Sequence, residues 1–445
     1  MSIFKAYDIR GIYPSEINEK IAYRIAQACG KYFAGEKVLV GGDCRLSTPL
    51  IKKAVIEGLL DKGLDVYDLG MVSTSTFNFL ISKNKFDFGL QITASHNPKE
   101  YNGIKVYDSV GNTVGFDFGL EKIEKIFKKI KQEEKKRKKG EYIDAKSLIE
   151  QHRKFLEKFL EKFEEKVAID YSNGCGSIIF SELIKEINAI ELNKEMDGNF
   201  PSHPPEPTKE NLTYLQEVVK REKCSFGAAF DGDADRIVFL DEKGNVLRGD
   251  QILFLFSKFL KPKKVVFEVS FPIIFKEELK KMKIECFESK VGRDMMNEMK
   301  KRDADLGGEI SSHFYFKETN FLEDAFLTFF KFMQILKRER KNVSELIKEY
   351  FVGISQSYKL KVKDEEKFDI VEKIKEELAK DYEVITIDGV KVILDEKNWF
   401  LIRASNTEPI IRIFIEGENE EKLKENKKIV ERYLKNLKNI FLPFE

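Results

Sequence analysis

The chain has 445 residues, of which 42% are hydrophobic and 34% are charged. This composition excludes a disordered chain and supplies apolar side chains for several cores, so two to four domains are expected. With 77 basic and 76 acidic residues, the formal net charge of +1 provides no overall field that would attract nucleic acid or an anionic membrane.

The cysteines and the N-terminal stretch indicate the compartment. The five cysteines are scattered without a Cys-x-x-Cys pair or zinc-like spacing, which favours reduced thiols. The stretch MSIFKAYDIRG does not have the pattern of a secretory signal, and no run of about 18 apolar residues predicts a membrane span. We therefore expect a cytoplasmic protein that binds neither nucleic acid nor a membrane.

Three segments share one pattern, in which a lysine precedes a short apolar run that ends at an acid or a glycine. They are KVLVGGD from Lys37, KVAIDYSNG from Lys166 and KVVFEVS from Lys264. Each predicts a buried strand, and each is followed by a segment of helical period: STPLIKKAVIEGLLDKG, SIIFSELIKEINA and FKEELKKMK. Strands that alternate with helices predict a mainly parallel α/β sheet in each region.

The last region has a different pattern. A predicted helix at residues 368–381 precedes predicted strands in VKVILD, WFLIRAS and PIIRIFIEG and a closing helix, which indicates a smaller α+β domain. The expected fold is therefore three similar mixed-sheet α/β domains followed by an α+β C-terminal domain. Their predicted bounds are 1–146, 147–247, 248–350 and 351–445.

The segment AAFDGDADRIVFLDEKGNVLRGD has the strongest signal for chemistry. Asp231, Asp233 and Asp235 alternate, so in an extended or gently turning segment their carboxylates converge on one side. Converging carboxylates repel one another unless a cation lies among them, which favours a hard ion such as Mg²⁺. One alternative is an EF-hand loop, although Arg236 stands where that loop needs glycine and IVFL predicts a strand. The other is a polar surface turn.

The segment ITASHNPKEYNGIKVY places Ser95 before a His-Asn-Pro turn. An acyl-transfer serine usually lies in a Gly-x-Ser-x-Gly elbow with a separate histidine base. Here the glycines are absent, and we expect the neighbouring His96 to be poorly placed to reach Ser95. A phosphoserine fits better, because Mg²⁺ held by the three aspartates could ligate its oxygens. Considered alone, TASHNP is equally consistent with an ordinary turn.

Six motifs, in this order along the chain, resemble those of the α-D-phosphohexomutase superfamily and its phosphomannomutase/phosphoglucomutase group. They are FKAYDIRG at Phe4, GDCRLSTP at Gly42, TASHNP at Thr93, DGDADR at Asp231, GGEISSHF at Gly307 and RASNTEP at Arg403. The resemblance covers essentially the whole chain. It implies four domains with the active site in a central cleft.

The resemblance implies a reaction cycle at Ser95. Phospho-Ser95 gives its phosphoryl group to a hexose 1- or 6-phosphate, and the resulting hexose 1,6-bisphosphate turns around and returns its other phosphate. The implied cofactor is Mg²⁺, with hexose 1,6-bisphosphate as activator, and the partners are small-molecule sugar phosphates. We expect a monomer or a weak homo-oligomer. The implied metal ligands are phospho-Ser95, Asp231, Asp233 and Asp235.

The resemblance also assigns the other site residues. Arg10 and Lys105 are implied in charge stabilisation and proton handling, and His313 as a proton carrier or phosphate partner. Glu309 and Ser311 are implied to bind the sugar 3- and 4-hydroxyls. The remaining implied substrate-binding residues are Arg236, Arg293 and the phosphate clamp of Arg403, Ser405, Asn406 and Thr407. The alternatives are a surface ion pair for Arg10, a solvent-facing position for Lys105 and an ordinary turn for the clamp.

Departures from the family's pattern leave the sugar open. Ser312 replaces the usual loop glycine, Arg293 stands where histidine is frequent, and Ser270 where lysine is frequent. Glucose and mannose share their 3- and 4-hydroxyl configurations, so a loop that reads only those groups predicts use of both. The alternatives are a phosphoglucosamine mutase, action on pentose phosphates and a non-catalytic sugar-phosphate-binding paralogue. The missing elbow disfavours a serine hydrolase, and His203 in GNFPSHPPEP is expected to be structural.

Overall fold

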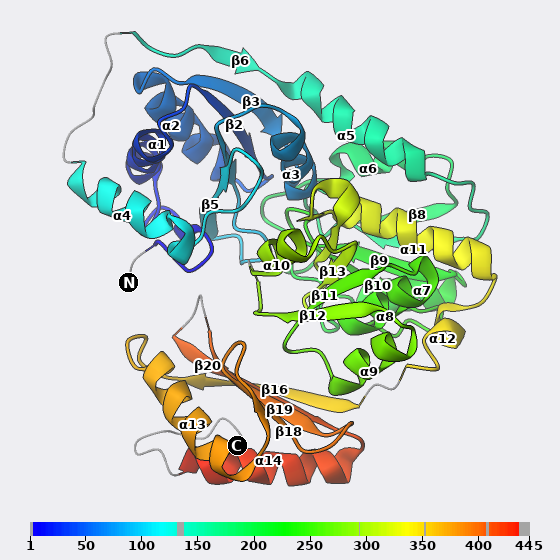
Figure 1. Ribbon diagram of the computed structural model, residues 1–445. Coiled ribbons are helices and arrows are strands. Elements are labelled where there is room, and N and C mark those ends of the chain that lie inside the picture. Colours follow the sequence, from blue (N-terminus) through cyan, green and yellow to red (C-terminus); the bar gives the residue numbers. More distant parts are fainter. Residues whose placement is uncertain (1–2, 131–137, 293, 351–352, 406–408, 436–445) are drawn as a thin grey trace. The chain divides into compact units, whose positions relative to one another are not determined.

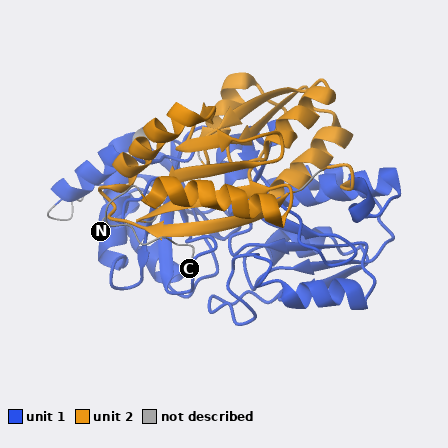
Figure 2. Ribbon diagram, turned by 90° about the horizontal axis from the view of Figure 1, so that it is seen from below, with its two compact units in different colours: residues 1–248, 311–346 blue, residues 249–310, 347–445 orange. Residues whose placement is uncertain are grey.

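The computed structural model divides into two compact units, which Figure 2 shows in blue and orange. Unit 1 comprises residues 1–248 and 311–346, and unit 2 comprises residues 249–310 and 347–445. The chain therefore passes from one unit to the other three times. The residues that the structure describes are 3–130, 138–292, 294–350, 353–405 and 409–435.

The first sheet of unit 1 has the strand order β1-β5-β4-β2-β3-β6. Strands β4, β2, β3 and β6 are parallel, whereas β5 is antiparallel to β4 and β1 is antiparallel to β5. The sheet is mixed, and its antiparallel pairs lie at one edge. Its strands are β1 (Ile9–Ile12), β2 (Lys37–Gly42), β3 (Asp65–Met71), β4 (Phe88–Ile92), β5 (Tyr101–Asp108) and β6 (Tyr142–Asp144).

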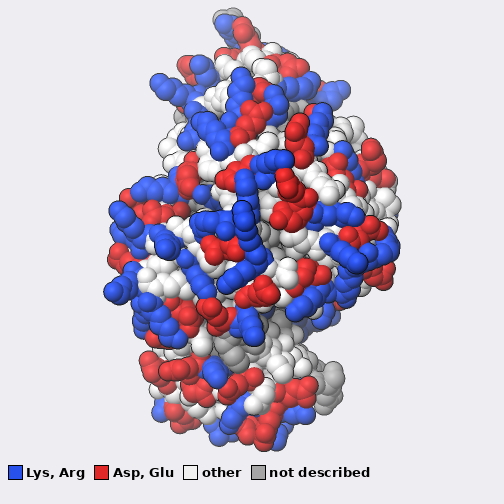
Figure 3. Space-filling view, turned by 90° about the vertical axis from the view of Figure 1, so that its right-hand side faces the viewer, with Lys and Arg blue, Asp and Glu red and all other residues white. Residues whose placement is uncertain are grey.

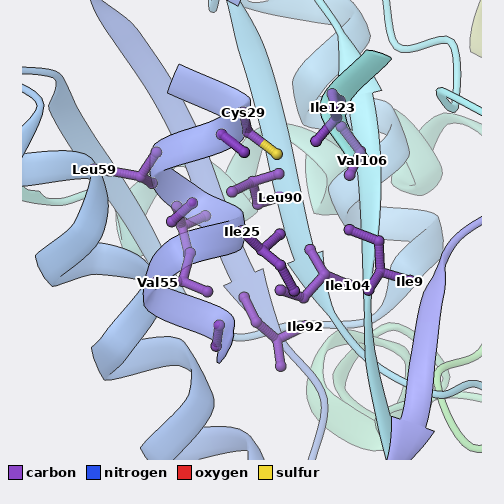
Figure 4. Close-up of a cluster of buried hydrophobic side chains, with 14 of the residues drawn as sticks. Ile9, Ile25, Cys29, Val55, Leu59, Leu90, Ile92, Ile104, Val106 and Ile123 are labelled. Atoms are coloured by element: carbon purple, nitrogen blue, oxygen red, sulfur yellow. The ribbon is translucent and has the colours of Figure 1, made fainter. Parts of the chain in front are cut away.

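Helices cover both faces of this sheet (Figure 1). One face packs against α1 (Glu19–Phe33), α2 (Thr48–Asp61) and α4 (Leu120–Lys129), and the other against α3 (Thr74–Lys83) and α5 (Ile149–Leu156). Burial of each large aliphatic side chain in such a core contributes about 1.5–3 kcal/mol. Figure 4 shows the core under α1 and α2, with labels on Ile9, Ile25, Cys29, Val55, Leu59, Leu90, Ile92, Ile104, Val106 and Ile123.

The second sheet of unit 1 has the order β10-β9-β7-β8, with β10 antiparallel to β9 and the other pairs parallel. Its strands are β7 (Val167–Asp170), β8 (Ala189–Leu192), β9 (Phe226–Phe230) and β10 (Ile237–Leu240), and its helices include α6 (Ser177–Leu183) and α7 (Thr213–Arg221). The observed α6 is shorter than the helix that SIIFSELIKEINA predicts. It ends at Leu183 because the chain must turn before β8 begins at Ala189.

Residues 311–346 complete unit 1 from far along the chain. They contain the antiparallel pair β14 (Phe314–Phe316) and β15 (Leu322–Glu323), then α11 (Ala325–Glu339) and α12 (Val343–Leu346). Helix α11 packs phenylalanines against the second sheet, for example Phe332 against Phe239 with ring centroids 4.1 Å apart. Further ring contacts pair Phe326 with Phe180 and Phe230, and Phe329 and Phe332 with Phe226.

Unit 2 begins with a parallel three-strand arrangement, in which β11 (Lys264–Glu268) lies between β12 (Glu285–Ser289) and β13 (Leu306–Gly308). The helices of this part are α8 (Gly249–Leu260), α9 (Ile273–Lys281) and α10 (Asp294–Arg302). The predicted strands from the lysine pattern are thus confirmed as β2, β7 and β11.

The C-terminal part of unit 2 is an antiparallel sheet of order β16-β20-β19-β18-β17. Its strands are β16 (Ile354–Lys361), β17 (Val384–Ile385), β18 (Val390–Ile393), β19 (Trp399–Ala404) and β20 (Ile410–Gly417), and α13 (Lys367–Asp381) and α14 (Glu420–Lys435) pack on one face. On the other face, Trp399 and Leu401 pack against Val269, and Lys391 Nζ donates to the carbonyl oxygens of Val269 and Phe271. The predicted fold class of mixed α/β sheets followed by an α+β domain is confirmed.

Charged side chains of both signs are intermixed on one face of the molecule (Figure 3). On the face that Figure 3 shows, basic and acidic side chains alternate over the described residues, as the nearly balanced composition predicts. Among these residues, none of the helices has both the length and the apolar character that a transmembrane span requires.

Candidate functional site

Two loops of unit 1 bring Ser95 and the three aspartates together. We name them by their predicted roles: the phosphoserine loop, residues 93–100, joins the antiparallel strands β4 and β5, and the metal loop, residues 231–236, joins β9 and β10. Gly232 permits their close approach, because a Cβ atom at this position would lie 2.8 Å from the carbonyl oxygen of Ser95. Ser95 itself has a left-handed backbone with φ of 49°, which for a residue with a side chain must be held by its surroundings.

The aspartates converge as the alternating sequence predicts. Asp231, Asp233 and Asp235 are 0%, 0% and 4% exposed, and each offers an oxygen within 4.8 Å of the others. Ser95 Oγ donates to Asp231 Oδ2 at 3.0 Å, so the serine hydroxyl lies directly against the cluster. The other oxygen of Asp231 accepts the backbone N–H groups of Asp235 and Arg236.

The two remaining carboxylates each have one occupied oxygen. Asp233 Oδ2 accepts from Thr74 Oγ1 at 2.6 Å, Lys105 Nζ at 2.9 Å and Thr93 Oγ1 at 3.1 Å. Asp235 Oδ2 accepts from Lys105 Nζ at 2.6 Å. Among the described atoms, the buried Oδ1 of Asp233 has no hydrogen-bond partner, and Asp235 Oδ1 has the His313 ring 3.3 Å away.

Electrostatics make this cluster suited to a cation. Burial, and then the charges of Asp235 and Asp233, raise the pKa of Asp231 well above its usual range. Burial opposes the charge of Lys105, but Asp233 and Asp235 outweigh it and raise the pKa of the lysine. The ammonium of Lys105 and the guanidinium of Arg236 carry two positive charges against three carboxylates. The buried Oδ1 atom of Asp233 has no donor among the described atoms and is a suitable ligand for a hard ion. The buried acidic triad can therefore hold a metal ion.

Arg45 holds the phosphoserine loop, a role that sequence reasoning missed. Its side chain is 1% exposed and donates to four backbone carbonyls and to the Asp43 carboxylate. The carbonyls belong to Ser95 at 2.7 Å, Asn97 at 2.6 Å, Pro98 at 2.7 Å and Tyr101 at 3.1 Å. A planar guanidinium with five donors suits this task. The available signal was the arginine in GDCRLSTP, whose motif was recognised without a role for this side chain.

The expectation for His96 was wrong. Its Nδ1 atom lies 3.2 Å from Ser95 Oγ. We attribute this to the left-handed backbone at Ser95, which turns neighbouring side chains away from the usual extended alternation. Burial, followed by the charges of Arg236 and Arg10, lowers the pKa of His96 well below its ordinary value, so the ring is neutral at pH 7.

The predicted cations lie at the same loops. Arg10 Nη1 donates to Asn97 Oδ1 of the phosphoserine loop at 2.7 Å, and Arg10 also pairs with Asp8. Arg236 Nε donates to His313 Nε2 at 3.2 Å, and the same Nε2 atom lies 3.3 Å from Asp235 Oδ1. Ser311 Oγ lies 3.0 Å from His313 Nδ1. The structure therefore connects Ser311 and His313 to Arg236 and Asp235 of the metal loop.

The other predicted residues belong to unit 2. Glu309 is 3% exposed, and its charge acts on the buried Glu268 of β11, which sequence reasoning did not assign. Glu268 Oε1 accepts from Ile310 N at 3.0 Å and from Ser270 Oγ, whereas its buried Oε2 has no hydrogen-bond partner among the described atoms. Burial and Glu309 raise the pKa of Glu268 to about 7.

The predicted phosphate clamp is described in part. Arg403 on β19 lies opposite Arg412 on β20, and two like charges in register are unfavourable unless an anion is nearby. Asp388 supplies a carboxylate 3.6 Å from Arg403 Nη1. Ser405 closes the strand end with its N–H donated to Ile410 O. The predicted residues Arg293, Asn406 and Thr407 lie outside the described residues.

Four family models match the chain in succession. They describe the alpha/beta/alpha domains I, II and III and the C-terminal domain of phosphoglucomutase/phosphomannomutase, and they match residues 1–134, 141–244, 248–352 and 358–432. The domain boundaries predicted from the sequence alone stay predictions.

Curated relatives extend over nearly the full length. The chain is 37% identical over 439 residues to a phosphomannomutase of Methanocaldococcus jannaschii, which covers 96% of each chain. It is 33% identical to a phosphomannomutase/phosphoglucomutase of Pseudomonas syringae, which covers 100% of this chain and 97% of that relative. It is 32% identical to a probable phosphoglucosamine mutase of Methanopyrus kandleri over 95% of each.

Among solved structures, the chain is similar to a phosphoglucomutase/phosphomannomutase family protein of Burkholderia thailandensis. The TM-score is 0.90 at 28% identity, with 99% of each chain covered. Together with the serine beside a buried triad of aspartates, these matches show that the chain belongs to the phosphoglucomutase/phosphomannomutase family.

Proposed function

We propose that the protein interconverts hexose 1-phosphates and hexose 6-phosphates, with mannose and glucose as the sugars. Phospho-Ser95 and a hexose 1,6-bisphosphate are the proposed intermediates. The observation that carries this proposal is the hydrogen bond of 3.0 Å between Ser95 Oγ and Asp231, within a buried cluster of three carboxylates. His96 Nδ1 also lies 3.2 Å from Ser95 Oγ, but three converging carboxylates form a cation site, which a Ser-His-Asp triad does not need.

The residues around Ser95 suit phosphoryl transfer, which depends mainly on positioning and charge stabilisation. Ser95 is 4% exposed, so its phosphoryl ester would be shielded from hydrolysis. Lys105, Arg10 and Arg236 supply fixed positive charge at the two loops. A Mg²⁺ ion bound by Asp231, Asp233, Asp235 and phospho-Ser95 would add positive charge at the transferring group.

Each residue would have a distinct part in the cycle. Lys105 holds Asp233 and Asp235 in place and presents an ammonium near the sugar hydroxyl that receives the phosphoryl group. His313 is proposed to carry a proton or contact phosphate, and Glu309 and Ser311 to bind the sugar 3- and 4-hydroxyls. Arg403, Ser405, Asn406 and Thr407 are proposed to hold the phosphate that is not transferring, with Arg293 as a further phosphate contact.

A phosphoglucosamine mutase is the second candidate. One observation favours it, since the carboxyl groups of Glu268 and Glu309 are both buried and act on each other. Such a carboxyl pair would attract the ammonium group of glucosamine phosphate. Mannose and glucose come first because the sugar loop of the family reads hydroxyl groups that these two sugars share.

Phosphorus-31 NMR of the purified protein tests the proposal. We expect mannose 1-phosphate and glucose 1-phosphate to be converted to 6-phosphates in the presence of Mg²⁺ and a trace of glucose 1,6-bisphosphate as activator. Ser95→Ala should abolish both conversions, whereas Ser82→Ala, a partly buried serine on α3, should leave them intact. Conversion of glucosamine 1-phosphate alone would support the second candidate. If no sugar phosphate is converted, the remaining alternative is a non-catalytic paralogue that binds sugar phosphates.

Two further properties belong to this proposal. The five cysteines are all free thiols, which supports the expected cytoplasmic location. We also propose a monomer or a weak homo-oligomer, and sedimentation velocity over a range of concentrations measures which of these occurs.

A further inference from the structure

A row of four hydroxyl side chains begins helix α3. Ser73 caps the helix, and its Oγ accepts from Thr76 N. The exposed fractions of Ser73, Thr74, Ser75 and Thr76 are 1%, 0%, 0% and 1%. Buried hydroxyls are unfavourable unless each has a partner, so the partners of this row show what it does.

Two members of the row hold the metal loop. Thr74 binds Asp233 twice, through its backbone N–H to the carbonyl oxygen at 2.7 Å and through Oγ1 to Oδ2 at 2.6 Å. Ser75 Oγ donates to the carbonyl of Ala234 at 2.6 Å and accepts from Ala325 N at 3.1 Å. Ala234 has a left-handed φ of 54°, so the anchored segment is a turn that needs such support.

The direction of these bonds decides which oxygen of Asp233 is available. Thr74, Thr93 and Lys105 all donate to Oδ2, and Oδ1 has no hydrogen-bond partner among the described atoms. Lys105 is shared with Asp235, and Thr93 Oγ1 also accepts from Ser95 N. The hydroxyl of Thr74 is thus the donor in this set with no second partner in the cluster, and its bond is the shortest of the three.

We propose that Thr74 is a positioning residue of the metal site, which holds the carboxylate of Asp233 through Oδ2 and leaves Oδ1 available as a ligand for a cation. The inference rests on the proposed function, because it presumes that the aspartates bind a divalent cation. Partners of this kind orient the ligands of metal sites, and their loss reduces metal affinity about 10- to 100-fold. We expect a reduction in this range when the Thr74 hydroxyl is removed.

Binding of Mn²⁺, followed by electron paramagnetic resonance of the free ion, tests the proposal without any sugar phosphate. Thr74→Val removes the hydroxyl and keeps the shape, whereas Thr74→Ser keeps the hydroxyl. Thr328→Val is the matched control, since Thr328 is equally buried in unit 1 and donates to the carbonyl of Asp324. Intact mass spectrometry ensures that all proteins have the same phosphorylation state.

We expect Thr74→Val to weaken Mn²⁺ binding about 10-fold or more, and Thr74→Ser and Thr328→Val to change it less than about threefold. Equal affinity in Thr74→Val and the wild type would overturn the role of Thr74 while leaving the proposed function intact. No Mn²⁺ binding by the wild type would overturn both. Circular dichroism identifies a misfolded variant. In that case Thr74→Ala, which removes the same hydroxyl without adding a methyl group, must weaken binding for the proposal to hold.

Discussion

The side chains of the metal and phosphoserine loops in unit 1 are anchored far more completely than Arg403, the described arginine of the predicted clamp in unit 2. Asp233 Oδ2 has three donors and Arg45 donates five hydrogen bonds, whereas Arg403 reaches Asp388 only at 3.6 Å. Among the described atoms, Arg403 Nη1 has no hydrogen-bond partner. Under the proposed function, the difference teaches that groups at the reacting centre are oriented by folding itself, while the clamp arginine keeps a donor for the ligand.

Arg45→Lys should have the largest effect on stability, because Arg45 anchors the phosphoserine loop. Lysine keeps the charge but cannot satisfy four carbonyls and Asp43 together, so we expect a loss of about 4 kcal/mol in the free energy of unfolding of unit 1. Urea unfolding followed by circular dichroism measures it. Arg24→Lys, where the arginine donates to Phe127 O, is the control and should change stability by less than about 1 kcal/mol. Equal losses of stability in both variants would show that the hydrogen bonds of Arg45 contribute no more than those of an ordinary arginine.

Glu268→Gln should sharpen the comparison from unit 2. The pKa of Glu268 is about 7 in the folded protein and 4.5 for an ordinary glutamate, so stability is lost as the pH rises from 4.5 through 7. Glutamine keeps an oxygen for Ile310 N and Ser270 Oγ and removes the titration. Above pH 7 we expect the variant to be more stable than the wild type by about 3 kcal/mol.

Fluorescence reports this effect selectively, because Trp399 is the single tryptophan of the sequence and lies in unit 2. Urea unfolding of both proteins at pH 5 and pH 8 should show a pH-dependent gap. Glu309→Gln removes the neighbouring negative charge, which should lower the pKa of Glu268 toward its ordinary value. The pH range over which stability is lost should then be narrower than in the wild type. The same difference in unfolding free energy between wild type and Glu268→Gln at pH 5 and at pH 8 would contradict a raised pKa for Glu268.

Arg403→Ala tests the predicted phosphate clamp of unit 2. If the clamp keeps its donors for a ligand, removing one should raise KM for hexose phosphates about 30-fold, which corresponds to about 2 kcal/mol, with a smaller change in kcat. The fluorescence midpoint of unit 2 should barely move. Arg432→Ala, on α14 beside Tyr433, serves as the control and should change neither quantity. A large fall in stability with unchanged KM would assign Arg403 to structure.

His203→Gln should have the smallest effect. Burial lowers the pKa of His203, but the hydrogen bond to Asp170 and its charge outweigh burial, so the folded pKa is raised. The protonated ring then contributes stability that is fully present below about pH 6.5 and is lost as the pH rises through the folded pKa. We expect a difference of about 1 kcal/mol between variant and wild type at pH 5.5 that shrinks by pH 9, as measured by thermal melting.

The sequence predicted the order of strands and helices and the convergence of the aspartates, because both follow from local periodicity and from motifs that are contiguous in the chain. It missed Arg45, Thr74 and Thr93, whose partners lie on other segments and whose importance depends on how many bonds meet at one atom. It also misjudged His96, because a left-handed residue reverses the expected direction of side chains. The assignment of α11 to unit 1 depends on aromatic packing that no local pattern reveals.

The late position of α11 has a consequence for synthesis of the protein. The helix supplies Phe326, Phe329 and Phe332 to the second sheet, and residues 249–310 are translated before it. During translation, Phe226 and Phe230 of that sheet therefore emerge from the ribosome before the rings of α11 that pack against them in the folded protein. Nascent chains that end before α11 present an exposed aromatic surface on the second sheet. Binding by chaperones should therefore be strongest for chains of this length and should decline once α11 has emerged.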